Sequence, residues 1–140
     1  MSKFIDPLIA EDLDDINFML VQSFRYQSDL LGKIILIPKG FDTDFCSTWS
    51  HKYARQAGAA HDWLYASAMV DRSTADLVLK EAIQTYPTLF VRSLAWPYYL
   101  AVRAWGWKPW GDHREAQDEL KCADLIRACA DSPDILNVTK

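Results

Sequence analysis

The pattern of apolar residues changes at Pro38-Lys39-Gly40, and this change constrains the fold more than any other feature of the chain. Before it, residues 17–26 and 33–37 are rich in aromatic and β-branched side chains, which is typical of strands. After it, apolar residues recur every three or four positions, as on one face of a helix. The sequence therefore predicts an α+β fold, in which a small N-terminal antiparallel sheet of about three strands packs with about four helices.

Three segments are expected to form the sheet. Residues 4–9 are a short apolar run interrupted by a proline, which suits an edge strand because proline has no N–H to donate to a neighbour. Residues 17–26 and 33–37 flank a turn-like segment that contains Gly32, so we expect them to form an antiparallel hairpin. The acidic residues 11–15 are interpreted as a solvated turn.

The helices are expected after the sheet, and their limits follow from caps and prolines. We predict that residues 106–111 form a turn before the last helix. The expected helices run from Ser47 or Ser50 to about Met69, over 73–86, over 88–107 with a kink or break at Pro97, and from Asp112 to about Ala130. The chain has the length of one domain, so we predict a single domain over 1–140, with the sheet in 1–40, the helices in 45–130 and a loose tail in 131–140.

Charge and cysteine content narrow the function classes. The net charge is −4 and the basic residues are scattered, which argues against a nucleic-acid partner because such proteins carry a basic patch or stripe. The three cysteines, Cys46, Cys122 and Cys129, form no paired motif, and the N-terminus lacks the basic-then-apolar layout of a secretory signal. We therefore expect reduced thiols and a cytoplasmic protein.

Residues 88–107 are apolar almost throughout and are about as long as a bilayer-spanning helix. Two arginines, Arg92 and Arg103, and the central Pro97 weigh against a membrane span. We expect a helix packed on the core, with an interfacial helix on a membrane as the alternative. Four of the six tryptophans fall in or just after this segment, and they would suit an aromatic surface that binds another protein.

The candidate site consists of Asp44, His61, Asp62 and Asp76. His61 and Asp62 are adjacent within a helix-favouring run, Asp44 lies in the turn upstream, and Asp76 lies near the start of the next helix. We predict that the two helices are antiparallel neighbours and that the turn folds back, so that Asp44 meets His61. One interpretation is a buried structural network, because Arg72 and Asp76 have salt-bridge spacing and buried polar groups need partners.

Three further interpretations of these residues remain open. One imidazole and two or three carboxylates are a ligand set for a divalent metal, Zn²⁺, Mn²⁺, Fe²⁺ or Mg²⁺, which would activate water for hydrolysis. In that case the same four residues are both catalytic and metal-binding. A binding site for a small ligand or peptide is the second, and a nucleophile, Cys46 or Ser47, beside His61 is the third.

Three segments together resemble a known family: 37–47, 59–65 and 72–76. They are similar to a Pro-x-Gly-Phe-x-Thr-Asp-Phe-x-Ser turn, a His-Asp-x-Leu-Tyr helix and an Arg-x-x-Ala-Asp helix of the phage and prophage family filed as domain of unknown function 1353. The segment 98–106 resembles the closing Tyr-x-Ala-Val-Arg-x-x-Gly stretch of that family, so the resemblance covers about 17–110. Where family members usually place a proline after the turn, this chain has Thr48-Trp49-Ser50, so the helix entry is expected to differ.

The resemblance implies a bacteriophage or prophage origin, and with it the host bacterial cytoplasm, but no established activity. The expected function is therefore a non-catalytic accessory, assembly or host-protein-binding factor built around the His-Asp network. A metal-dependent hydrolase with a His/Asp-coordinated divalent metal is the alternative. If the non-catalytic role holds, no cofactor is expected.

Overall fold

The computed structural model describes residues 1–15, 17–45 and 53–130, and its fold is α+β as predicted. The strands form two small antiparallel sheets rather than the single sheet expected, with strand orders β1-β4-β5 and β2-β3-β6. The strands are β1 (Lys3–Phe4), β2 (Ala10–Asp12), β3 (Phe18–Leu20), β4 (Phe24–Ser28), β5 (Lys33–Ile37) and β6 (Asp42–Thr43). The predicted hairpin is confirmed, because β4 pairs with β5 in the register Phe24↔Ile37 to Ser28↔Lys33.

Three predictions about the strands were wrong. Of residues 4–9, the expected edge strand, only Phe4 lies in a strand, β1. The segment 17–26 is two strands, β3 and β4, which lie in different sheets. Buried residues stand at even positions in both strands, and the exposed Gln22 between them interrupts the alternation. Hydrogen bonds from Val21 N to Ile9 O and from Lys39 N to the Ser23 hydroxyl hold the bend. The acidic segment 11–15 is not only a turn, because Glu11 joins β2, an edge strand whose carboxylates face solvent.

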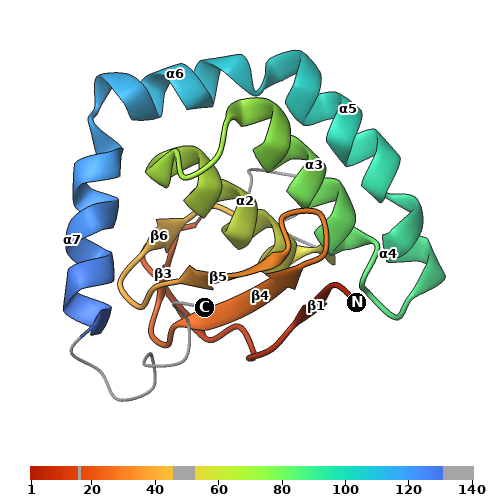
Figure 1. The fold of residues 1–140 in the computed structure, drawn as a ribbon, viewed down its shortest axis with the longest axis horizontal. Coiled ribbons are helices and arrows are strands. Elements are labelled where there is room, and N and C mark those ends of the chain that lie inside the picture. Colours follow the sequence, from red (N-terminus) through yellow and green to blue (C-terminus); the bar gives the residue numbers. More distant parts are fainter. Residues whose placement is uncertain (16, 46–52, 131–140) are drawn as a thin grey trace.

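The described helices are α2 (Arg55–Ser67), α3 (Arg72–Ile83), α4 (Leu89–Ser93), α5 (Ala95–Trp105), α6 (Trp107–Glu115) and α7 (Asp118–Ala130). The chain runs through α4, α5, α6 and α7 as an outer arc around α2, α3 and the sheets (Figure 1). The predicted helix start at Ser47 or Ser50, the altered entry at 48–50 and the predicted tail at 131–140 lie outside the described residues.

The helix limits confirm the predicted division of 88–107 and overturn the predicted turn at 106–111. The apolar segment 88–107 is divided at Leu94, before Pro97, and 106–111 is not a turn but the start of α6. Pro97 and Pro109 each stand in the first turn of a helix, where a backbone N–H has no intrahelical acceptor to lose. The expected single helix from Asp112 to Ala130 is likewise divided, because Gln117 has a positive φ of 55°.

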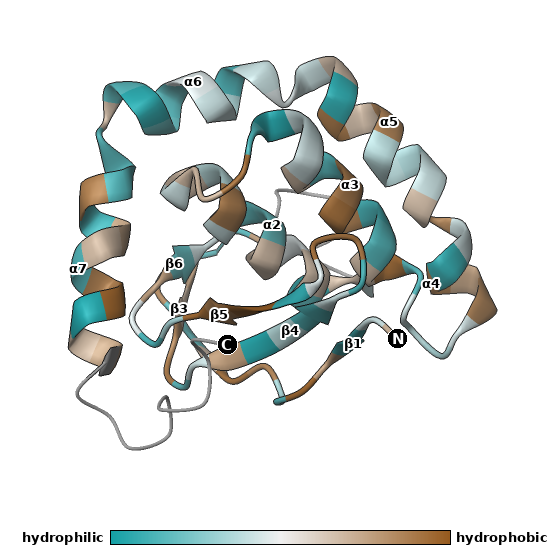
Figure 2. Ribbon diagram, viewed as in Figure 1, coloured by the Kyte–Doolittle hydropathy of each residue, from teal (hydrophilic) through white to brown (hydrophobic). Residues whose placement is uncertain are grey.

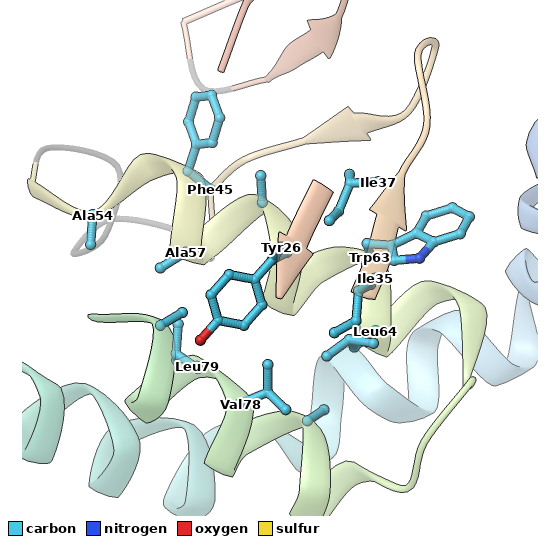
Figure 3. Packing of buried hydrophobic residues seen from close by; sticks show 14 of the residues in the cluster. Tyr26, Ile35, Ile37, Phe45, Ala54, Ala57, Trp63, Leu64, Val78 and Leu79 are labelled. Carbon is cyan, nitrogen blue, oxygen red and sulfur yellow. The ribbon is translucent and has the colours of Figure 1, made fainter. Parts of the chain in front are cut away.

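The core lies between the sheets and the two central helices. Trp63 and Leu64 of α2 lie close to Ile35 and Ile37 of β5, with Val78 of α3 beyond them (Figure 3). β5 is the most continuously hydrophobic strand in the ribbon, as expected for a strand with a covered face (Figure 2). This packing fixes α2 against α3. None of the helices in the described part of the chain is both long enough and apolar enough to cross a bilayer.

Candidate functional site

Asp76 of α3 is the centre of a buried polar network. Its side chain is fully buried, and its Oδ1 accepts a hydrogen bond from the Tyr65 hydroxyl at 2.6 Å and lies 2.8 Å from Nε2 of His61. Its Oδ2 accepts a hydrogen bond from Nη1 of Arg103 in α5 at 2.8 Å. Three elements, α2, α3 and α5, thus place their side chains on one carboxylate.

Helix geometry explains why α2 supplies two of these groups. His61 and Tyr65 are four residues apart, so they lie one above the other on the same face of the helix. The short connection at Ala68, which has a left-handed φ of 53°, ends α2 and returns the chain as α3. Asp71 then caps α3 by accepting a hydrogen bond from Thr74 N at 2.7 Å, whereas the sequence suggested Ser73 or Thr74 as the helix start. This turn brings Asp76 opposite His61.

Two arginines offset the charge of the Asp76 carboxylate. Arg103 contacts Oδ2 directly, and Nη1 of Arg72 lies 3.7 Å from the same oxygen, so the predicted Arg72–Asp76 pair forms at longer range. Burial and the hydrogen bond to Asp76 raise the pKa of Tyr65 well above its ordinary value. Tyr65 therefore remains a proton donor to Asp76 at neutral pH.

A second contact joins the β6 turn to α2. The Thr43 hydroxyl donates a hydrogen bond to Oδ2 of Asp62 at 2.6 Å and accepts one from Phe45 N at 2.9 Å. The turn therefore folds back onto the helix, as predicted, and one contact between them runs from Thr43 to Asp62. Asp44 lies beside this contact and takes part in lining the cavity described next.

A cavity of about 460 Å³ lies between the β6 turn, α2 and the inner face of α5 and α6. Its polar wall includes Asp42, Asp44, His61 and Asp62. Its apolar wall includes Phe41, Leu79, Tyr98, Val102, Trp105 and Pro109. A largely apolar cavity with a few grouped polar side chains is the usual form of a small-molecule site.

The structure brings together three of the four candidate residues at the cavity, Asp44, His61 and Asp62, and places Asp76 behind His61. Within residues 1–15, 17–45 and 53–130, no group of three or more His, Cys, Asp or Glu side chains is arranged to hold a metal ion. Both oxygens of Asp76 already accept hydrogen bonds, and Arg103 beside it would repel a cation. The four residues therefore do not fit one metal, and we derive no step through a metal.

Arg103 is the member of the network that the sequence analysis did not connect to Asp76. It was expected at the edge of an apolar helix, whereas its guanidinium reaches a carboxylate 27 positions away. An arginine inside an apolar run requires an anionic partner, so the position of Arg103 in the sequence could have predicted a carboxylate beside it. The guanidinium of Arg55 lies over the rings of Phe18 and Phe45, at 5.3 and 5.4 Å from their centroids. Cys46 and Ser47, the nucleophile candidates, lie outside the described residues.

Comparison with known proteins identifies a family that matches this chain. The family model described as "Protein of unknown function (DUF1353)" matches residues 18–102, more than half of the chain. The chain belongs to the DUF1353 family. The matched span contains both helices of the DUF1353 His-Asp network and ends one residue before Arg103. Searches of curated proteins and of solved structures found no match.

Proposed function

We propose that this DUF1353 protein is a hydrolase in which His61, oriented by Asp76, activates a water molecule against an ester held in the cavity. One observation carries the proposal: His61 lines the 460 Å³ cavity while its Nε2 is held 2.8 Å from a fully buried carboxylate. A histidine bonded to a buried carboxylate and facing a substrate cavity is the usual arrangement of a general base.

In the proposed reaction, Nδ1 of His61 accepts a proton from water as the water oxygen bonds to the ester carbonyl carbon. Asp76 stays ionised and stabilises the imidazolium through Nε2, while Tyr65 and Arg103 hold its two oxygens in place. The imidazolium then returns the proton to the leaving alcohol oxygen as the C–O bond breaks. The products are a carboxylic acid and an alcohol, and the positioned base supplies roughly 10²–10⁴-fold of the rate.

A non-catalytic phage accessory, assembly or host-protein-binding factor is the second candidate function. The observation that favours it is the exposure of three of the four clustered tryptophans, Trp96, Trp105 and Trp107. In either case we propose a phage or prophage protein of the host bacterial cytoplasm. The family resemblance supports the origin, and the unpaired cysteine pattern supports the compartment.

Turnover of soluble p-nitrophenyl esters with acyl chains of different length tests the hydrolase. We expect activity with the wild-type protein, at least a 100-fold loss in His61→Ala, and partial recovery when imidazole is added to that variant. Lys121→Ala, on the exposed side of α7, is the control and should keep the wild-type rate.

The fold of His61→Ala must be followed by circular dichroism and urea unfolding, since the lost side chain leaves Asp76 short of a partner. Rescue by imidazole identifies a chemical role, because a merely structural loss would not be reversed in rate by a free base. Absence of turnover with every ester, or a His61→Ala variant as active as wild type, would overturn the hydrolase and leave the non-catalytic role.

A further inference from the structure

The outer face of α4, α5 and the start of α6 is apolar where a solvent-facing helix is ordinarily polar. In α5, Trp96, Leu100 and Ala104 follow one another at four-residue steps, so they form a stripe on the side away from the core. The exposed apolar side chains carried by α4, α5 and the first residue of α6 are Leu89 (76 %), Phe90 (56 %), Trp96 (56 %), Leu100 (58 %), Trp105 (71 %) and Trp107 (64 %). We call this set the outer aromatic face.

The stretch of chain that carries the outer aromatic face lacks acidic residues. Residues 82–111 contain no Asp or Glu, although the whole chain carries net charge −4. The basic residues of this stretch are Arg92, Arg103 and Lys108. Arg103 is paired with the buried Asp76 and Lys108 with Asp112, whereas Nζ of Lys80 lies 3.7 Å from the Trp96 ring centroid. Exposed tryptophans accompanied by Lys80 and Arg92 complement the headgroup region of an anionic bilayer.

The outer aromatic face is continuous with the cavity. Trp105 belongs to both, because it lines the cavity and is also 71 % exposed. The opposite side of the same helix supplies Tyr98, Ala101 and Val102 to the cavity wall. A molecule that leaves a surface on which α5 lies can therefore pass Trp105 and reach His61 along apolar side chains.

We infer that the outer aromatic face binds an anionic phospholipid bilayer and that the cavity receives an acyl ester of a membrane lipid. The inference of bilayer binding depends on the exposure and charge of the face. The inference of a lipid-ester substrate depends on the proposed hydrolase function. In the reaction, water supplies OH to the acyl carbon and H to the glycerol oxygen, so that a fatty acid and a lysophospholipid leave. The mostly apolar cavity suits an acyl chain, and the four polar residues opposite suit the ester end.

Vesicle co-sedimentation tests the inference of bilayer binding without reference to catalysis. We expect the full chain to bind vesicles of phosphatidylglycerol and phosphatidylethanolamine on the order of tenfold more tightly than phosphatidylcholine vesicles. Leu100→Glu should weaken binding by at least about tenfold. Leu120→Glu is the matched control, since Leu120 of α7 is 61 % exposed, against 58 % for Leu100, and lies outside the outer aromatic face. Equal binding by both variants, or no sedimentation of wild type, overturns the inference and leaves the face to a protein partner.

Fatty-acid release from the same vesicles tests the inference of a lipid-ester substrate. We expect release by wild type, loss in His61→Ala, and loss in Leu100→Glu that keeps the wild-type rate on a soluble ester. Soluble-ester activity without release from bound vesicles overturns the lipid substrate and leaves the hydrolase intact. Vesicle binding with no turnover of any ester overturns the hydrolase and the lipid-ester substrate, and leaves the membrane interface.

Discussion

Arg103 of α5 donates a hydrogen bond to Oδ2 of Asp76 in α3 at 2.8 Å and thereby ties the outer arc of helices to the central pair. Asp76 is fully buried, and Arg103 is its closest cation, so the carboxylate depends on this guanidinium for charge compensation.

Replacing Arg103 by methionine should therefore lower the free energy of unfolding by about 2–3 kcal/mol, measured by urea unfolding at pH 7. Lys108→Met is the control, because its ion pair with Asp112 is exposed, and the urea midpoint should not change. In the Asp76→Asn background the loss at Arg103 should become small. Equal losses in both backgrounds would show that the two side chains are not coupled.

Gly106 and Gly111 should respond in opposite ways to alanine. A Cβ at Gly106 would overlap the Tyr65 hydroxyl and the Val102 carbonyl oxygen, so the backbone between α5 and α6 must move and the Tyr65–Asp76 bond with it. We expect a loss of about 2–3 kcal/mol on thermal or urea unfolding. At Gly111, in α6, an added Cβ would meet no heavy atom within 4 Å, so Gly111→Ala should stabilise by about 0.5–1 kcal/mol. Destabilisation at both sites would refute this account of the α5–α6 junction.

Thr43 should contribute to the free energy of unfolding through the hydrogen bonds of its hydroxyl rather than through the volume of its side chain. Thr43→Val keeps the volume but removes the hydrogen bonds to Asp62 and Phe45 N, and should cost about 1–2 kcal/mol in urea unfolding. Thr43→Ser keeps the hydroxyl and should lose less. A larger loss in the serine variant would mean that the methyl group, packed in the core, dominates.

Asp6 should contribute stability that depends on pH. Both of its oxygens accept hydrogen bonds from the Arg25 side chain, at 2.7 and 2.9 Å, and these bonds, opposed by partial burial, lower the pKa of Asp6 below 3.8. A folded-state pKa below the unfolded value gives stability that is present above about pH 4 and is lost as pH falls through the folded pKa.

Asp6→Asn should therefore be less stable than wild type at pH 7, by on the order of 1 kcal/mol for this partly exposed pair. The difference in melting temperature should shrink as pH falls below about 4. A difference that is the same at pH 7 and pH 2 would assign the effect to packing instead of charge.

Much of the His-Asp network could be predicted because it depends on local rules. Two helices joined by a short turn must be antiparallel neighbours, and that rule places Asp76 near His61. Arg103 could not be assigned in the same way, since its position depends on the path of α4 and α5 around the core.

The two prolines and the strand that is divided between two sheets show a second limit of predicting the fold from sequence patterns. Proline can follow the end of one helix or stand in the first turn of the next. Pro97 and Pro109 therefore suggested a break and a turn in the sequence. In the structure, each stands in the first turn of a helix. In 18–26 the buried positions keep the same alternating phase on both sides of the bend, and the exposed Gln22 is the interruption. Sequence periods report which face is buried, and they do not report what it is buried against.

The network has a consequence for how this protein can be shortened. The family match stops at Val102, and a fragment trimmed there would contain Asp76 without its closest cation. It would also lack Arg114, whose Nη2 donates to the carbonyl oxygens of Tyr65 and Ala66 at the end of α2. The unit that folds must therefore extend at least through α6, and the family's recognisable signature is shorter than the piece of chain that can stand alone.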